Sequence, residues 1–435
     1  MTGSKVVPGA PPIPSERGPP PLSLYIHIPW CVRKCPYCDF NSHELQGVLP
    51  ESAYVSAVLR DLEHEAGRIG GREVQTIFIG GGTPSLLSGE AVRCLLSGVR
   101  ARVTVATAAE VTLESNPGSV DGGRLVDYQE AGVNRLSIGV QSFRARQLAA
   151  LGRIHGVDDA LRAFETARRA GVSNINLDLM FGLPEDDLDR SLQDLSQAIA
   201  LGPEHLSWYQ LAIEPNTAFY RHPPELPDDD GVYAAYGAGR TLLRERGYLQ
   251  YEVSAYARAG AECRHNRNYW EFGDYLGIGA GAHGKLSDLG RRRIVRSAKR
   301  AKPLSYMNGS YMNGAGSLAA IVEDPPLTEA QLTVEFMMNA LRLCAGFPLS
   351  LFTERTGLPV EAITDTLDEA SERGLIEVRA GWIRPTEWGY RYLNELVYLF
   401  YRDEPDAPRG AVVATRRCET IVESQGGRSA SSRAQ

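Results

Sequence analysis

The chain has 435 residues, of which 43% are hydrophobic and 23% are charged, and its formal net charge is −7. This length and hydrophobic content are typical of two or three domains with sizeable cores. The acidic balance argues against broad nucleic-acid binding by the whole surface. No apolar run approaches the roughly 20 residues that span a membrane, so the cytoplasm is the expected location.

Strands and helices are expected to alternate after a proline-rich leader. Residues 1–21 contain few large apolar side chains and are predicted to be disordered. The strand-like segments that follow are mostly apolar nearly throughout, as strands buried on both faces are; they are Leu22–Ile28, Thr76–Ile79, Glu110–Leu113, Arg135–Val140, Ile175–Phe181 and Leu206–Ile213. Apolar residues at three- and four-residue spacing predict helices between them, over Glu51–Arg68, Gly89–Arg102, Asp121–Glu130, Val157–Arg169 and Leu188–Ala200.

These six strand–helix units predict an α/β fold over residues 22–290, a partial (β/α)6 barrel of the TIM type. Tyr251–Ala255 and Tyr275–Ile278 are predicted to be strands that flank the barrel. Chemistry in such folds lies beyond the carboxyl ends of the strands. The side chains that follow the strands are therefore the candidates for function.

The pattern changes after residue 290. Residues 291–327 are predicted to be a connecting loop, and the basic stretch Arg291–Lys302 within it is expected to be solvated, with an anionic ligand or partner as the alternative. Residues 328–402 predict helices, a short hairpin and a last helix, an order typical of a winged helix. The hairpin carries little positive charge, which favours a structural or partner-binding role over DNA binding. Residues 403–435 are predicted to be a disordered tail.

Three cysteines after the first strand are the strongest chemical signal in the sequence. Cys31, Cys35 and Cys38 have C-x3-C-x2-C spacing within a short loop. An electron-transfer [4Fe–4S] cluster usually has four thiolate ligands, so three ligands suit a cluster with one iron open to a small molecule. Structural zinc is the alternative, with His27 or His43 as the fourth ligand, but no second C-x2-C pair follows.

Other candidate residues follow later strands. Gly80-Gly81-Gly82-Thr83 lets the backbone approach a ligand closely, or forms an ordinary tight turn. Glu114 is a ligand carboxylate or a charged loop residue. Asp178 interrupts an apolar strand and needs a partner, for which Arg153 is a candidate, either in a structural ion pair or beside a ligand. The remaining strand-end candidates are Gln141 and Ala212.

A late motif, Cys263-Arg-His265-Asn-Arg-Asn-Tyr269-Trp270, combines a histidine with two aromatic residues. Histidine is an axial ligand of haem iron in many proteins, and aromatic rings pack on the macrocycle. The alternative is a polar turn with two packing aromatics, because isolated histidines are common.

Together these motifs resemble one family from about Leu22 to Tyr398. The segments Tyr25-Ile-His-Ile-Pro-Trp-Cys, Gly-Gly-Gly-Thr-Pro, Gly-Val-Gln-Ser-Phe, Asp-Leu-Met-Phe-Gly-Leu-Pro and His-Asn-x-x-Tyr-Trp are similar to those of the radical S-adenosylmethionine (SAM) proteins related to oxygen-independent coproporphyrinogen III oxidase. The oxidases carry a fourth cysteine two positions after the third, where this chain has Phe40. The resemblance is therefore to the haem chaperone branch, HemW.

The resemblance implies a haem chaperone with a [4Fe–4S] cluster and SAM, and no coproporphyrinogen oxidase activity; the oxidase reaction is the alternative. Haem would be the cargo and haem-requiring apoproteins the acceptors, with peripheral contact with membrane haem proteins and no nucleic-acid partner. Cys31, Cys35 and Cys38 would ligate the cluster. The implied contacts to cluster-bound SAM are Tyr25, Gly81, Glu114 and Ala212; those matching a second SAM in the oxidases are Tyr37, Gly82, Thr83, Gln141, Arg153 and Asp178. His265 is the candidate haem ligand.

Overall fold

The computed structural model describes residues 18–119, 121–288, 293–309, 321–323 and 327–401. Only the end of the predicted leader, from residue 18, falls within these ranges. The predicted tail at residues 403–435 lies outside the described residues.

A twelve-stranded sheet forms the larger part of the protein, in the order β14-β13-β12-β11-β1-β4-β5-β6-β7-β8-β10-β9. Neighbouring strands from β11 to β8 are parallel, and antiparallel strands extend the sheet at both edges. Because the order ends in two different strands, the sheet is an open partial barrel, as predicted. The parallel strands are β11 (Asp274–Ile278), β1 (Leu22–Ile28), β4 (Val74–Gly81), β5 (Val105–Ser115), β6 (Arg135–Gln141), β7 (Ile175–Phe181) and β8 (His205–Gln210).

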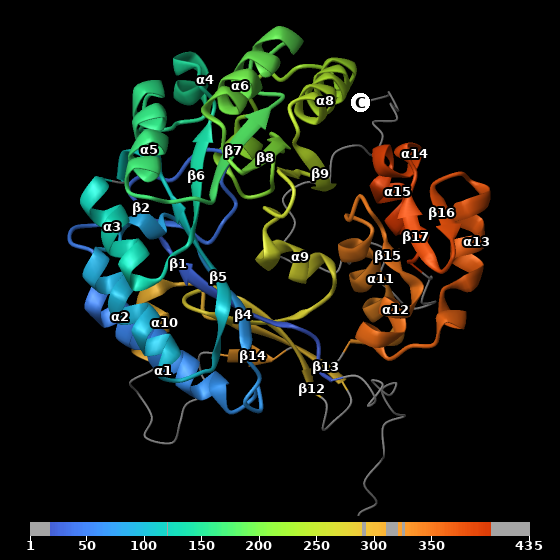
Figure 1. Ribbon diagram of the computed structural model, residues 1–435, viewed down its shortest axis with the longest axis horizontal. Helices are drawn as coiled ribbons and strands as arrows, with labels where there is room; N and C mark the ends of the chain where they lie inside the picture. The colour runs from blue at the N-terminus through green and yellow to red at the C-terminus, as the bar shows by residue number, and fades with distance from the viewer. Residues whose placement is uncertain (1–17, 120, 289–292, 310–320, 324–326, 402–435) are drawn as a thin grey trace, which may run out of the picture.

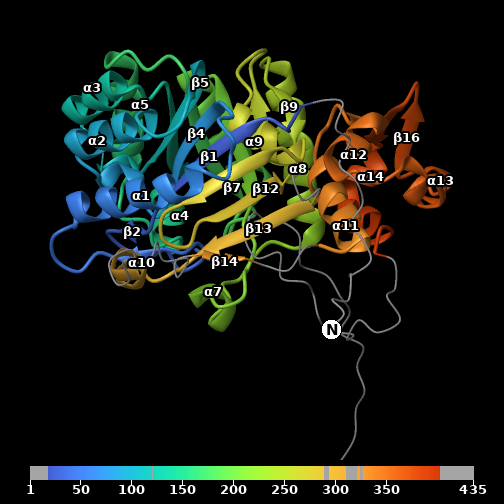
Figure 2. The ribbon, with the colours of Figure 1, turned by 90° about the horizontal axis from the view of Figure 1, so that it is seen from below.

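Helices follow the parallel strands and cover the outside of the curved sheet (Figure 1). They are α1 (Glu51–Ala66), α2 (Gly89–Arg100), α3 (Gly122–Ala131), α4 (Ala145–Ala150), α5 (Val157–Arg169), α6 (Leu188–Leu201) and α8 (Asp229–Glu245). The short helix α7 (Ala218–Arg221) projects from this layer in Figure 2. The predicted strands and helices agree with these elements to within a few residues at most ends. The exceptions include the start of β5, which begins five residues earlier than predicted.

Residues of the parallel strands alternate between two environments. Positions such as Leu24 and Ile26 of β1 belong to the large apolar core that packs beneath the helices. The positions between them face the other side of the sheet, where hydrogen bonds join polar side chains of neighbouring strands, such as Thr76 to Ser23. The description of the strands as apolar nearly throughout misses this alternation. The barrel interior is polar, which suits the binding of a polar ligand.

Two predictions on the sheet edges need correction. The predicted single strand Tyr251–Ala255 covers the end of one strand, a two-residue turn and the start of a second strand. The two antiparallel strands are β9 (Leu249–Glu252) and β10 (Ala255–Ala257). The predicted solvated loop Arg291–Lys302 is largely β13 (Arg293–Lys299), which lies between β12 (His283–Asp288) and β14 (Ile321–Glu323) and precedes α10 (Pro303–Gly309).

The ion pairs of Lys299 explain why this part of the basic stretch can be buried. Its Nζ donates to a carboxylate oxygen of Asp61 at 2.7 Å and of Glu65 at 2.6 Å, both on α1. A buried ammonium is tolerated when it is paired in this way. The partners are more than 230 positions away in the sequence, so the local composition suggested solvent instead.

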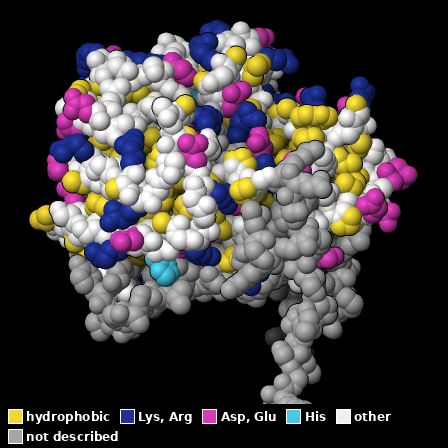
Figure 3. All heavy atoms as spheres, turned by 60° about the horizontal axis from the view of Figure 1, so that its bottom comes forward, with side chains coloured by type: hydrophobic (Ala, Val, Ile, Leu, Met, Phe, Trp, Pro, Cys, Tyr) yellow, Lys and Arg dark blue, Asp and Glu magenta, His cyan; other side chains and the backbone are white. Residues whose placement is uncertain are grey.

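The C-terminal domain packs beside the sheet (Figure 2). It has the predicted helices followed by a hairpin, and its core includes Trp270 and Phe272 from the barrel. On the face in Figure 3, Lys and Arg side chains are interspersed with Asp and Glu side chains. The elements are α11 (Glu329–Ala340), β15 (Phe347–Pro348), α12 (Leu349–Thr356), α13 (Thr364–Glu372), β16 (Ile376–Arg379), β17 (Trp382–Pro385), α14 (Glu387–Arg391) and α15 (Leu393–Tyr398).

Candidate cluster and ligand site

The three cysteines lie on one loop at the carboxyl end of β1. Cys31 ends the short strand β2 (Trp30–Cys31), which pairs with β3 (His43–Glu44) and closes the base of the loop. Within the loop, the Cys38 N–H donates to the Cys35 carbonyl at 3.1 Å. Lys34 Nζ donates to the Phe40 carbonyl at 3.1 Å. The loop is therefore shaped by its own hydrogen bonds and presents three thiols from one short segment.

All three thiols are free and partly exposed. Burial raises the pKa of Cys31, and the hydrogen bond with Thr83 opposes that shift. Burial also raises the pKa of Cys38. The Arg153 guanidinium lies next to the thiol of Cys35 and donates to its Sγ at 3.6 Å. Cations and hydrogen-bond donors favour thiolates, which are the ligating form, so this donor set fits the irons of a cluster.

The two histidines considered for zinc make hydrogen bonds within the same region. His27 Nδ1 is 2.9 Å from the Tyr25 hydroxyl, and its Nε2 is 2.9 Å from the Asn41 carbonyl oxygen. His43 Nε2 is 3.2 Å from Asn41 Oδ1. These contacts tie the end of the cysteine loop to β1. They also place Tyr25 beside the loop.

The glycine turn at the end of β4 lies close to His27 of β1 and to Trp30 of β2. Gly81 has φ +115°, and a Cβ there would lie 2.6 Å from the His27 ring. A Cβ on Gly82 would lie 2.5 Å from the Trp30 carbonyl oxygen. The Gly81 N–H donates to Glu114 Oε2 at 3.0 Å. Glycine is therefore required for the chain to pass here, and the turn brings Glu114 to the site.

Two half-buried carboxyl groups lie on the inner face of the sheet near this turn. Burial, and then the charge of Asp178, raise the pKa of Glu114 to about 8. Asp178 accepts from Ser137 Oγ at 3.0 Å and from Asn176 Nδ2 at 2.8 Å, and burial raises its pKa. The predicted partner, Arg153, instead donates to a backbone carbonyl of β6 at 2.7 Å. Of the two alternatives for Arg153 and Asp178, the structural ion pair is not formed among the described contacts.

Arg135 is the charged neighbour that sequence reasoning missed. It is 2% exposed on β6, and its positive charge opposes the rise in the pKa of both Glu114 and Asp178. Within the described part of the chain, its Nε has no hydrogen-bond partner. The sequence offered one indication of this role, because a charged residue at the start of an apolar, buried strand is unusual.

Further predicted residues surround the same end of the sheet. Gln141 is buried with φ +70°, and its Oε1 accepts from the Tyr209 hydroxyl at 2.7 Å. The Tyr37 ring is 6.4 Å from the Phe219 ring, between centroids. Phe219 and Ala212 lie in the segment that follows β8. The segment that follows the last parallel strand thus contacts the cysteine loop, and the Phe219 N–H donates to the Pro36 carbonyl at 2.9 Å.

His265 lies elsewhere. It belongs to α9 (Arg264–Trp270), between the sheet and the C-terminal domain (Figure 1). Its ring nitrogens contact Thr76 Oγ1 and the Tyr269 hydroxyl, each at 2.8 Å. Burial lowers the pKa of His265 to about 3, so the ring is neutral. Thr76 is near the start of β4 and Gly81 is its last residue, which separates them by roughly 17 Å at the usual rise of a strand.

Comparison with known proteins supports this division into a barrel and a C-terminal domain. Residues 25–195 match the radical SAM superfamily, and residues 327–392 match the HemN C-terminal domain. The solved structure of Escherichia coli coproporphyrinogen III oxidase (HemN) is similar with a TM-score of 0.74 and 22% identity, covering 89% of this chain and 91% of that chain. At this identity the similarity concerns the fold alone.

Curated relatives are closer in sequence. The chain is 52% identical over 381 residues to "Heme chaperone HemW" of Escherichia coli, covering 88% of this chain and 98% of the relative. It is 46% identical over 389 residues to the protein of the same name in Haemophilus influenzae, covering 88% and 99%. It is 34% identical over 385 residues to the protein of that name in Bacillus subtilis, covering 87% of this chain and 98% of the relative. This chain belongs to the HemW heme chaperone family of the radical SAM superfamily.

Proposed function

We propose that this protein binds haem and transfers it to haem-requiring apoproteins in the cytoplasm, without coproporphyrinogen oxidase activity. The observation that carries the proposal is Phe40, 51% exposed on the cysteine loop, at the position where the oxidases have a further cysteine. It occurs in a chain that is 52% identical to a relative named heme chaperone.

Radical SAM membership implies a [4Fe–4S] cluster and SAM. Cys31, Cys35 and Cys38 would hold the cluster, because they are free thiols on one loop with Arg153 beside them. When bound, a reduced cluster of this superfamily supplies the electron that cleaves SAM to a 5′-deoxyadenosyl radical. Haem transfer itself needs no such cleavage, so the cluster and SAM would order or regulate the haem site.

The residues around the cluster loop would bind SAM through charge and close backbone approach. Glu114 and Asp178 are half-buried carboxyl groups with raised pKa values, and their ionised forms would suit the positive charges of SAM. Gly81 and Ala212 offer backbone without bulky side chains, and Tyr25 lies beside the loop. A second SAM would be held by Tyr37, Gly82, Thr83, Gln141, Arg153 and Asp178.

Haem would bind at the α9 end, with His265 as the axial ligand. The exposed cations Arg264 and Arg267 on the same helix suit the haem propionates. Acceptors would be haem-requiring apoproteins, and transfer to membrane haem proteins would use peripheral contact. Across the described ranges, no helix has the length and apolar character needed to cross a membrane.

The test is an anaerobic titration of the reconstituted protein with haem, followed by the Soret band, together with a coproporphyrinogen turnover assay. The expected result is haem binding by the wild type, loss of the complex in His265→Ala, and no porphyrinogen product. His64→Ala, which changes an exposed histidine of α1, is the matched control. Porphyrinogen turnover without haem binding would instead establish the oxidase reaction.

A further inference from the structure

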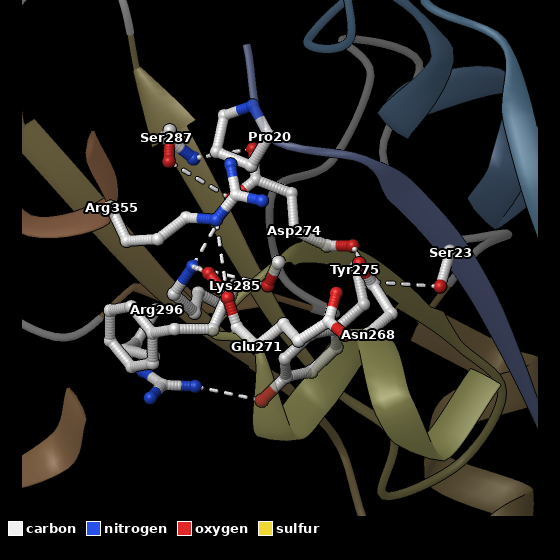
Figure 4. Close-up of polar contacts among 12 residues, drawn as sticks. Pro20, Ser23, Asn268, Glu271, Asp274, Tyr275, Lys285, Ser287, Arg296 and Arg355 are labelled. Atoms are coloured by element: carbon white, nitrogen blue, oxygen red, sulfur yellow. Dashed lines mark hydrogen bonds and ion pairs between the residues drawn. The ribbon is translucent and has the colours of Figure 1, made fainter. Parts of the chain in front are cut away.

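The directions of the hydrogen bonds around α9 assign the protonation of His265. Thr76 Oγ1 donates its hydrogen to Ser23 Oγ at 2.8 Å. Thr76 Oγ1 must then accept from His265 Nδ1, so Nδ1 carries the ring hydrogen. Asn268 Nδ2 also donates to Ser23 Oγ at 2.8 Å and fixes this hydroxyl (Figure 4).

The remaining ring nitrogen, Nε2, therefore presents a lone pair. In the described contacts that lone pair accepts the hydrogen of the Tyr269 hydroxyl at 2.8 Å. Histidines that bind metals typically donate their other ring N–H to an oxygen, which fixes the tautomer and the ring orientation. His265 already has this arrangement, with Thr76 as the oxygen partner and Tyr269 in the place of a metal.

Packing distinguishes the two edges of the ring. The Nδ1 edge faces Thr76, which is 2% exposed, and the ring centroid is 5.1 Å from that of Phe78, so this side is inside the barrel. His265 itself is 1% exposed, whereas Tyr269 is partly exposed. A ligand approaching Nε2 from outside would meet Tyr269.

A chain of side-chain contacts links Tyr269 to the C-terminal domain. The Tyr269 ring packs edge-on against Tyr275 of β11, with centroids 4.6 Å apart. Arg296 Nη1 donates to the Tyr275 hydroxyl at 2.7 Å, as Figure 4 shows, and Arg296 also pairs with Glu335 of α11. The residue that covers Nε2 is therefore connected through side chains to the C-terminal domain.

We propose that the Tyr269 hydroxyl is a cap on His265 Nε2, which iron must displace, and that Thr76 holds the imidazole in the tautomer that can bind iron. This inference rests on the proposed function, because it concerns haem as the cargo. The exchange breaks one O–H···N hydrogen bond and the bond between iron and its axial water, and it forms one iron–nitrogen bond. The released water returns to the solvent. No proton leaves the imidazole, and no electron is transferred.

The experiment is an anaerobic Soret titration of the full-length reconstituted protein with ferric haem. Tyr269→Phe keeps the ring and removes the competing hydroxyl, so haem should bind about 2- to 10-fold more tightly, the range given by one neutral hydrogen bond. Thr76→Val keeps the shape and removes the partner of Nδ1, so haem should bind more weakly by a similar factor. Opposite signs are the signature of the cap, because merely structural roles would weaken binding in both variants.

A measurement without haem tests the hydrogen bond itself. The ¹⁵N resonance of His265 Nε2 should shift in Tyr269→Phe toward that of an imidazole nitrogen with a free lone pair. Tyr248→Phe is the matched control, because Tyr248 is a buried tyrosine that donates to the Pro203 carbonyl at 2.6 Å, away from α9. It should change neither haem affinity nor this resonance.

The remaining outcomes separate the cap from the proposed function. Haem binding by the wild type with equal or weaker binding by Tyr269→Phe would overturn the cap and leave the chaperone function intact. Haem binding by His265→Ala that equals the wild type's would also overturn the cap and leave the chaperone function intact. Absence of haem binding in the wild type would overturn both.

Discussion

The two ends of the parallel strands differ in how their polar groups are satisfied. At the carboxyl end, three free cysteines and two carboxyl groups are partly exposed, and the pKa values of both carboxyl groups are raised. At the other end, both ring nitrogens of His265 have hydrogen-bond partners, and Glu110 accepts the N–H groups of Arg264 at 3.1 Å and His265 at 3.0 Å.

This difference affects what each end of the sheet gains when it binds a ligand. Raised carboxyl pKa values mark groups whose charge is stabilised incompletely, so the carboxyl end of the sheet gains from a cationic ligand. The α9 end gains less from added partners, and there a ligand must exchange with an existing hydrogen bond. Under the proposed function, the first end would hold the resident cofactors and the second would bind the cargo reversibly.

The largest expected effect is at the cysteine loop. Cys35→Ser should abolish the cluster, because the loop then has only two of its thiolates and serine ligates iron poorly at neutral pH. Iron and acid-labile sulfide analysis of anaerobically reconstituted protein measures this. Cys94→Ser, at an exposed cysteine of α2, should retain full iron content, and loss of iron there would contradict the assignment.

A backbone change should affect the same end without removing the cluster. Gly81→Ala places a Cβ against His27 at a positive φ, a strain of roughly 1–3 kcal/mol. Affinity for SAM, measured by anaerobic calorimetry, should fall about tenfold or more. Gly237→Ala in α8 has no neighbour within 4 Å and should not lower it. Unchanged SAM affinity in Gly81→Ala would remove the glycine turn from the site.

The α9 end should be loosened by removing its N-terminal acceptor. Glu110→Ala leaves the N–H groups of Arg264 and His265 without a carboxylate, at a cost of about 1–3 kcal/mol. Hydrogen exchange should accelerate across α9 while iron content is unchanged. Glu90→Ala, at an exposed position of α2, is the control. Equal exchange in both variants would show that Glu110 does not anchor the helix.

The smallest expected effect is a pH dependence. Glu114 has a pKa raised to about 8, so its neutral form predominates in the folded protein below that pH. If Glu114 binds SAM as proposed, its ionised form attracts the positive charges of SAM, and SAM affinity should therefore rise as pH increases through about 8. Because the pKa is higher in the folded protein than in the unfolded chain, the contribution of Glu114 to the free energy of unfolding decreases as the pH rises from about 4.5 to about 8. Glu114→Gln should flatten both profiles, and an unaltered profile would assign the titration elsewhere.

The parallel strands and the cysteine loop were predictable because their signals are local. Leu22–Ile28 and Ile175–Phe181 were predicted with the observed bounds, and C-x3-C-x2-C spacing is itself a short-range pattern. The surroundings of His265 were not predictable in this way. Its Nδ1 partner, Thr76, is 189 positions away, and Glu110 is 155 positions from its N–H. Such contacts depend on the assembled sheet.

Charged strand residues show the same limit. Arg135 and Lys299 are fully or almost fully buried, and in sequence each resembles a residue that faces solvent. For Lys299 the compensating acids lie on α1, and for Arg135 the nearby acids lie on other strands. Local composition records the cost of burying a charge but not the partner that offsets it.

The most direct test of the division between the two ends is one anaerobic haem titration performed on Cys35→Ser and His265→Ala in parallel. The account predicts that Cys35→Ser lacks the cluster yet still forms a Soret-absorbing haem complex. It predicts that His265→Ala keeps its cluster and loses that complex. Haem binding by His265→Ala together with its loss in Cys35→Ser would contradict the account and place the haem site at the cysteine loop.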